Sequence, residues 1–185
     1  MHYAWIIAFT GTLVTILAHG FGRMSYSVIL PPMKDGLMLN YTQLGSIATG
    51  NFIGYLSLAI IGGFLAARFG VRRVVFISLL VIGISLFLTG LSESFLFAFM
   101  MRLIAGLGNG GAYVPIMALP AAWFIAKKRG LATGIVSGGI GTGLFLAGVI
   151  LPPIISAFGK DGWRYAWYFL GIAVFVLGFV CYVFL

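Results

Sequence analysis

Two arginines and one histidine stand inside otherwise apolar stretches of this chain. The first stretch reads ILAHGFGRMSYSVIL, from Ile16 to Leu30, and contains His19 and Arg23. A second stretch, FMMRLIAGLGNGGA from Phe99 to Ala112, contains Arg102. A guanidinium is costly in such surroundings, and its planar fork of donors suits a carboxylate or a phosphate. One chemistry that these residues indicate is therefore the binding of an anion.

Helical periodicity places further polar residues beside the two arginines. At about 100° per residue, Arg23 falls within roughly 80° of Thr12, Thr15, His19 and Tyr26, and Arg102 shares a stripe with Gly106, Asn109 and Tyr113. Counted from the ends of their apolar runs, both arginines are expected about 10 Å below the same membrane surface. The candidate substrate-binding residues are Arg23, Arg102, His19, Tyr26, Asn109, Tyr113 and Thr15.

Two structural interpretations of the arginines compete with an anion site. Each side chain could extend toward the membrane interface, or it could donate to backbone carbonyls that the neighbouring glycines expose. His19 is as consistent with packing as with proton transfer, although it is the one group in these runs that titrates near neutral pH. Asn109, Tyr26 and Tyr113 are equally consistent with packing.

The composition indicates that the helices of this chain are surrounded by lipid. Of the 185 residues, 62% are hydrophobic and 8% are charged, and the mean hydropathy is +1.14. A soluble domain carries roughly a quarter charged residues. Apolar runs of about 20 residues recur along the chain, which is the length a helix needs to cross hydrocarbon. Because backbone groups in lipid must pair within their own segment, the fold class predicted is all-α integral membrane.

Six transmembrane helices are predicted, at about residues 3–30, 41–66, 74–91, 95–124, 130–158 and 163–185. The loops after the second and fourth helices hold six basic residues and no acid: Arg68, Arg72, Arg73, Lys127, Lys128 and Arg129. The other loops hold three charges of each sign. The positive-inside rule therefore predicts a cytoplasmic N-terminus in a plasma (inner) membrane, and the net charge of +8 gives no reason to expect nucleic acid.

Three sequence matches recur in the same order, about 84 to 90 residues apart. GFGRMSYSV is echoed by GLGNGGAYV, ATGNFIG by ATGIVSG, and ARFGVRR by SAFGKDGWR. The matches predict two three-helix repeats. Because each repeat has an odd number of helices, the second is inverted relative to the first, as is typical of secondary transporters.

The segment GGFLAARFGVRRV resembles the signature loop between helices two and three of the major facilitator superfamily. It matches that loop at Gly63, Arg68, Gly70, Arg72 and Arg73, while Ala67 stands where the family usually has Asp. The resemblance implies a gating role for this loop, with a latch that is weaker or built differently. FMMRLIAGLGNGGA, WFIAKKRGLATG and GWRYAWYFLG resemble the family's fourth helix and the approaches to its fifth and sixth. Both the monocarboxylate and oxalate/formate branches and an uncharacterised bacterial branch fit these motifs.

Family members have two six-helix domains, so the resemblance implies that this chain is one N-terminal domain without its C-terminal partner. The chain is then either a fragment or a half-size protein that must pair. The function implied is half of an alternating-access secondary transporter, and the two arginines favour a small organic anion. Coupling to protons is implied by the resemblance alone. A transporter of neutral or cationic solutes, sugar or drug-like, and a non-transporting receptor or scaffold are the alternatives.

The expected partners are the lipid bilayer, a small-molecule substrate, protons and a second six-helix half. The sequence holds no paired acids, no metal-ligand cluster and no nucleophile with a base at usable spacing, so we expect neither an enzyme nor a cofactor. Three glycine pairs at four-residue spacing predict close helix packing: Gly50 with Gly54, Gly134 with Gly138, and Gly139 with Gly143.

Overall fold

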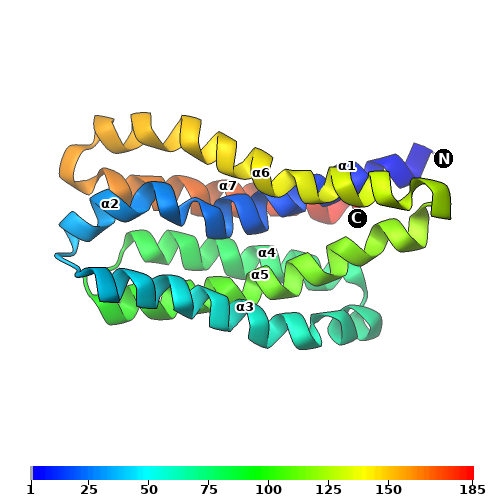
Figure 1. The fold of residues 1–185 in the computed structure, drawn as a ribbon, viewed down its shortest axis with the longest axis horizontal. Coiled ribbons are helices and arrows are strands. Elements are labelled where there is room, and N and C mark those ends of the chain that lie inside the picture. Colours follow the sequence, from blue (N-terminus) through cyan, green and yellow to red (C-terminus); the bar gives the residue numbers. More distant parts are fainter. Residues whose placement is uncertain (1) are drawn as a thin grey trace.

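The computed structural model describes residues 2–185, with side chains from residue 3 onward. Six helices in this range are long and apolar enough to cross a membrane (Figure 1). The first consists of α1 (His2–Thr15), the π-helical segment η1 (Ile16–Met24) and α2 (Tyr26–Gly36). The others are α3 (Tyr41–Phe69), α4 (Val71–Gly90), α5 (Phe95–Trp123), α6 (Ala126–Ala157) and α7 (Gly162–Phe184), with a short 3₁₀ turn η2 (Gly159–Asp161).

The predicted fold class is confirmed, since the residues described form six spanning helices and no strand. Large apolar side chains point outward along the bundle, for example Phe9, Ile60 and Phe145. An outer surface of this kind is stable in lipid and not in water. The chain is therefore a multi-pass membrane protein.

The two ends of the bundle differ in charge. Both termini lie at one end, together with the connections between α3 and α4 and between α5 and α6 (Figure 1). We call this the basic end, because it carries Arg68, Arg72, Arg73, Lys127, Lys128 and Arg129. The opposite end holds the other three connections and carries Lys34, Asp35, Glu93, Lys160, Asp161 and Arg164; we call it the mixed-charge end.

Several helices extend beyond their predicted limits. The first helix continues past Leu30 to Gly36 across Pro31 and Pro32. Each proline removes one helical N–H, but its ring fixes φ near the helical value, so the helix can continue through the pair. At the basic end, α3 continues to Phe69, α4 begins at Val71 and α6 at Ala126, so all six basic residues predicted to lie in loops belong to helix ends.

Only Gly70 separates α3 from α4, and its φ of +87° explains why the chain can turn so tightly there. An L side chain rarely adopts this backbone conformation, whereas glycine does so at little cost. The turn therefore depends on glycine at this position.

The packing of the helices follows the predicted inverted repeat. The second helix of the first unit, α3, packs along α5, and the second helix of the second unit, α6, packs along α1 and η1. The third helices of the two units, α4 and α7, pack against each other. Exchanging the units therefore reproduces the same set of helix contacts.

Glycines set the closest helix crossings. Gly54 faces the Leu103 carbonyl and Gly106 faces the Asn51 carbonyl, so α3 and α5 approach backbone to backbone. Gly143 of α6 meets Gly20 of η1 in the same way, since a Cβ on Gly20 would lie 2.5 Å from the Gly143 Cα. Gly134 and Gly138 lie on an open face of α6, with no described atom within 4 Å of an added Cβ, so close packing at this pair stays a prediction.

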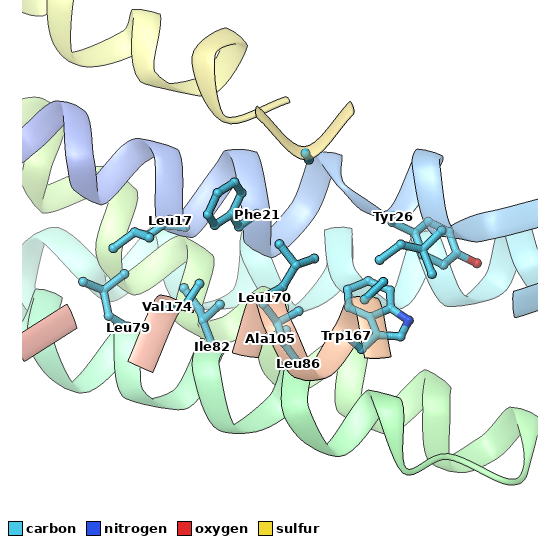
Figure 2. Packing of buried hydrophobic residues seen from close by; sticks show 14 of the residues in the cluster. Leu17, Phe21, Tyr26, Leu79, Ile82, Leu86, Ala105, Trp167, Leu170 and Val174 are labelled. Atoms are coloured by element: carbon cyan, nitrogen blue, oxygen red, sulfur yellow. The ribbon is translucent and has the colours of Figure 1, made fainter. Parts of the chain in front are cut away.

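The core lies between η1, α4, α5 and α7. Figure 2 shows Leu17 and Phe21 of η1 facing Leu79 and Ile82 of α4, with Val174 of α7 between the elements. Farther toward the mixed-charge end the core continues to Leu86, Leu170, Trp167 and Tyr26. This packing holds η1, which carries two of the candidate residues, against the centre of the bundle.

Candidate substrate-binding site

A cavity of about 370 Å³ lies between the η1–α2 junction, α3 and α5, in the half of the bundle nearer the mixed-charge end. Its polar lining consists of Arg23, Arg102, Asn51, Tyr26, Ser27 and Tyr41. The remaining lining is mostly apolar, and none of the described residues that line it carries a carboxylate. The cavity is therefore a mainly apolar space with two positive side chains and no acid, a combination suited to a small anion.

The wide turn of η1 carries Arg23 to this cavity. The Ser25 N–H donates to the Gly20 carbonyl at 3.0 Å, a bond across five residues. Such π-helical turns are rare and often occur at functional sites. They also rotate the chain by less than 100° per residue, so side chains before and after η1 do not keep the single stripe that an α-helix predicts.

Arg23 stacks on aromatic rings of α3. Its guanidinium carbon lies 3.7 Å from the centroid of the Phe52 ring and 5.0 Å from that of Tyr55. The side chain is half-buried, and with the described residues it makes no side-chain hydrogen bond and no ion pair. Stacking occupies the faces of the guanidinium and leaves its N–H edges for a ligand.

Arg102 has a different environment. It is 1% exposed, its Nη1 donates to the Gly22 carbonyl at 2.8 Å, and its guanidinium lies over the rings of Trp167 and Tyr26 at 5.0 and 5.3 Å. The interpretation that an arginine donates to a carbonyl near the glycines is therefore confirmed for Arg102. Neither its Nε nor its Nη2 donates to a described residue, so donors of both nitrogens remain without a partner.

Removing Arg102 should destabilise the protein more than removing Arg23. Arg102→Ala leaves a large internal cavity and deprives the Gly22 carbonyl of its donor, so we expect a loss of about 3 kcal/mol in the free energy of unfolding. Arg23→Ala should cost less than about 1 kcal/mol, because Arg23 is half-buried and has no hydrogen bond to lose. Thermal unfolding in detergent measures both. Equal effects of the two substitutions would contradict this division of roles.

Tyr26 is the third predicted residue that lines the cavity. Its ring packs beside that of Trp167 (Figure 2). The two ring centroids are 6.5 Å apart. Its hydroxyl donates to the Leu44 carbonyl at 3.1 Å. Tyr26 therefore contributes a wall to the cavity and supports Arg102, while its only O–H is already used.

His19 and Tyr113 form a separate aromatic group. The His19 ring lies 4.2 Å from that of Tyr113 and 5.5 Å from that of Tyr55, centroid to centroid. Since Tyr55 also lies under Arg23, the group is contiguous with the cavity without lining it. The Nδ1 of His19 has no partner among the described residues.

Asn109 and Thr15 do not reach the cavity. Asn109 is fully buried, with both amide atoms unpartnered in the part of the chain described. Thr15 donates to the Val136 carbonyl of α6 at 2.6 Å, so it lies at a helix crossing. The predicted common stripe of Thr15 and Arg23 is wrong, because η1 interrupts the α-helical rotation between them.

The sequence interpretation missed the contribution of α3. Asn51, Phe52 and Tyr55 form the side of the site opposite η1, and Asn51 donates from Nδ2 to the Arg102 carbonyl at 2.9 Å. The sequence contains a feature that could have predicted the role of Asn51, since this amide lies inside an apolar run between Gly50 and Gly54. An amide in such a run usually has a specific partner.

The predicted gating residues lie away from this cavity, at the basic end or toward it. Arg72 stacks on Tyr182 at 4.3 Å, and Arg68 lies over Phe69 at 5.5 Å. Arg73 borders a second, apolar cavity of about 280 Å³ between α3 and α4. Gly70 forms the turn, and Gly63 lies within α3 near Val114. The loop is thus a basic, glycine-centred turn, and its gating role stays a prediction.

Comparison with known proteins identifies several relatives. The chain is 31% identical over 150 residues to a "Probable sulfoacetate transporter SauU" of Cupriavidus necator, covering 80% of this chain and 34% of that protein. It is 29% identical over 166 residues to a "Cis,cis-muconate transport protein" of Acinetobacter baylyi, covering 90% of this chain and 40% of that protein. A "Probable galactarate/D-glucarate transporter GudP" of Escherichia coli is 26% identical over 184 residues, which is 95% of this chain and 39% of that protein. This chain thus spans well under half the length of these relatives.

A solved structure shares the fold. The crystal structure of a bacterial homolog of the human lysosomal transporter Spinster, inward-facing and unoccupied, matches with a TM-score of 0.82 at 19% identity, over 99% of this chain and 43% of that one. The family model described as Major Facilitator Superfamily matches residues 12–185, which is nearly the whole chain. The chain therefore belongs to the major facilitator superfamily.

Proposed function

We propose that this chain is the N-terminal six-helix domain of an alternating-access transporter for small organic anions, and that Arg23 holds the negative charge of the substrate. The observation that carries the proposal is the state of Arg23: it lines the cavity with its guanidinium over the Phe52 and Tyr55 rings, and it makes no hydrogen bond or ion pair with a described residue. A charge in that position calls for an anionic partner.

The cavity and the relatives support the same class of substrate. Two guanidiniums and no carboxylate in the described lining disfavour a cation. The three relatives named above are described as transporting, respectively, sulfoacetate, cis,cis-muconate, and galactarate or glucarate, all of which are organic anions. Membership in this family also agrees with the expectation that the chain catalyses no chemical reaction.

We further propose that a second six-helix half completes the site. The chain covers 34% to 40% of the three relatives, and the described lining of the cavity comes from η1, α2, α3 and α5 alone. Such transporters rock two halves around a central site. The second half comes either from the same polypeptide or from another copy of this chain.

Proton coupling is part of the proposal, with its carboxylate in the second half. His19 is the candidate proton carrier of the present half, because its Nδ1 is unpartnered among the described residues and it adjoins Tyr55 beneath Arg23. If His19 serves only for packing, His19→Gln will leave the dependence of uptake on a proton gradient unchanged.

Transport assays test the proposal directly. The native polypeptide that contains this chain is purified, reconstituted in sealed liposomes and offered labelled sulfoacetate, cis,cis-muconate, galactarate, glucose or choline. We expect the vesicles to accumulate at least one of the anions and neither glucose nor choline. Accumulation of glucose or choline alone would support a transporter of neutral or cationic solutes. Binding of an anion without accumulation would support a receptor.

Cysteine labelling tests the proposed orientation in the inner membrane. Cys181, the one cysteine of these 185 residues, is buried. Replacing it and every cysteine elsewhere in the native polypeptide by alanine gives a background without thiols. In that background, Lys160→Cys at the mixed-charge end should react with an impermeant maleimide added to intact cells. Lys127→Cys at the basic end should react only after the membrane is opened. The reverse pattern would place the N-terminus outside.

A further inference from the structure

Asn51 presents a hydrogen-bond acceptor that nothing in the described structure uses. The residue lines the cavity, is 2% exposed, and its Oδ1 is buried without a partner. A buried amide oxygen left unpaired costs free energy, so such an atom in a binding cavity points to a missing donor.

The hydrogen bond of Asn51 Nδ2 fixes the orientation of the side-chain amide. Asn51 Nδ2 donates to the Arg102 carbonyl at 2.9 Å, and a flipped amide would set Oδ1 against that carbonyl, with two acceptors facing each other. The backbone is held as well, because Gly106 of α5 packs directly against the Asn51 carbonyl. The acceptor is therefore positioned before any ligand arrives.

The three hydroxyl groups of the lining either have hydrogen-bond partners or belong to an exposed residue. Tyr26 donates to the Leu44 carbonyl and Ser27 donates to the Met24 carbonyl, while Tyr41 is largely exposed. Among the described residues that line the cavity, the unpartnered polar groups are thus the guanidinium N–H groups of Arg23, the Nε and Nη2 of Arg102 and the acceptor of Asn51. The complementary ligand carries an acidic group for the arginines and an O–H or N–H donor for Asn51.

We infer that Asn51 is a specificity-determining residue, whose amide oxygen accepts a hydrogen bond from a hydroxyl of the substrate, so that the site prefers hydroxylated anions over anions of the same length without hydroxyls. This inference rests on the proposed function. A site built to bond a hydroxyl rejects the analogue that lacks it, because the buried acceptor is then left unpaired.

The test compares matched ligand pairs on the solubilised native polypeptide. Galactarate and adipate have the same carbon chain and two carboxylates, and only galactarate has hydroxyls; malate and succinate form a shorter pair. We expect the wild type to bind the hydroxylated member of at least one pair about tenfold more tightly. Asn51→Leu should remove that preference by weakening the hydroxylated ligand, while the affinity of the other ligand stays within about twofold.

Three controls separate the possible outcomes. Unchanged binding of adipate or succinate shows that the Leu variant is folded, and Asn51→Ala, which cannot overfill the crossing of α3 and α5, repeats the test if the Leu variant is unstable. Thr49→Val changes a hydroxyl on the same helix that donates to its own backbone and lies outside the cavity lining, so it should leave the preference intact.

If Asn51 variants lose affinity for both ligands of a pair to the same extent, the inference is overturned and the proposed function stands. The same holds if the wild type binds both ligands of each pair equally well. If the wild type binds none of these anions, or if Arg23→Gln leaves their affinities unchanged, the proposed function fails and the inference fails with it.

Discussion

Arg23→Gln is expected to lower the affinity of the native polypeptide for its anion about a hundredfold and to abolish measurable uptake at low substrate concentration. The guanidinium lines the cavity over the rings of Phe52 and Tyr55, and it is the one half-exposed guanidinium among the described lining residues, since Arg102 is buried. Charge-assisted, two-pronged hydrogen bonds to a carboxylate are among the strong polar contacts in proteins, and glutamine offers only a shorter side chain with a neutral donor. Equilibrium binding and initial uptake rates in liposomes measure the loss.

A second substitution at Arg23 separates the effect of its charge from that of its planar pair of donors. Arg23→Lys keeps the charge but not the planar pair of donors, so we expect an intermediate loss of about tenfold. Lys34→Gln removes a positive charge at the mixed-charge end, outside the cavity lining, and should change affinity by less than about twofold. Anion uptake by Arg23→Gln at the wild-type rate would refute the role given to Arg23.

Gly106→Ala is expected to lower the free energy of unfolding by about 3 kcal/mol or to prevent folding. A Cβ at this position would overlap the carbonyl of Asn51 and would lie 3.0 Å from the Tyr55 N, so the obstacle is backbone and no side chain can rotate away. Accommodating it would separate α3 from α5 beside the cavity, so binding should weaken as well. Thermal unfolding in detergent and anion binding measure the two effects.

The same substitution at Gly134 provides a matched control. Gly134 lies in α6, its backbone is helical, and a Cβ added there would have no described atom within 4 Å. Gly134→Ala should leave stability unchanged or raise it by up to about 1 kcal/mol, because alanine favours the helix. A stability loss at Gly134 equal to that at Gly106 would show that the crossing of α3 and α5 does not depend on glycine.

The fold could be predicted from the sequence because lipid imposes simple rules. Apolar runs of spanning length had to be helices, and matches such as GFGRMSYSV with GLGNGGAYV indicated the inverted repeat that the packing of α3 on α5 and of α6 on η1 now shows. Helix ends were less accurate, because Arg72, Arg73 and Lys127 suggested loops although charged residues readily occupy helix ends at a membrane surface.

Part of the spatial grouping could be predicted. Arg23, Arg102 and Tyr26 line one cavity, as depth and spacing along two helices predicted, while their role in binding stays a prediction. The structure places Thr15 outside the cavity lining, because periodicity assumes a regular α-helix and the chain from Thr15 to Arg23 runs through the π-helical segment η1. The close approach of Gly20 in η1 to Gly143 of α6, far away in the sequence, could not be read from that periodicity.

The unlike environments of the two arginines could not be predicted either. Arg102 is buried against Trp167 of α7 and donates to the Gly22 carbonyl, whereas Arg23 stacks on Phe52 of α3. These partners come from three different helices, and the choice among them depends on how the helices are rotated about their axes. Sequence spacing within one helix carries no information about that rotation.

An anion-bound structure of the native polypeptide would decide whether Arg23 holds the substrate. The measurement is the distance between the guanidinium nitrogens of Arg23 and the acidic group of a bound organic anion. We expect at least one distance of about 2.7–3.0 Å, with Arg23 still stacked on Phe52. An anion bound elsewhere, with Arg23 paired to a carboxylate of the second half, would contradict the proposed role of this residue.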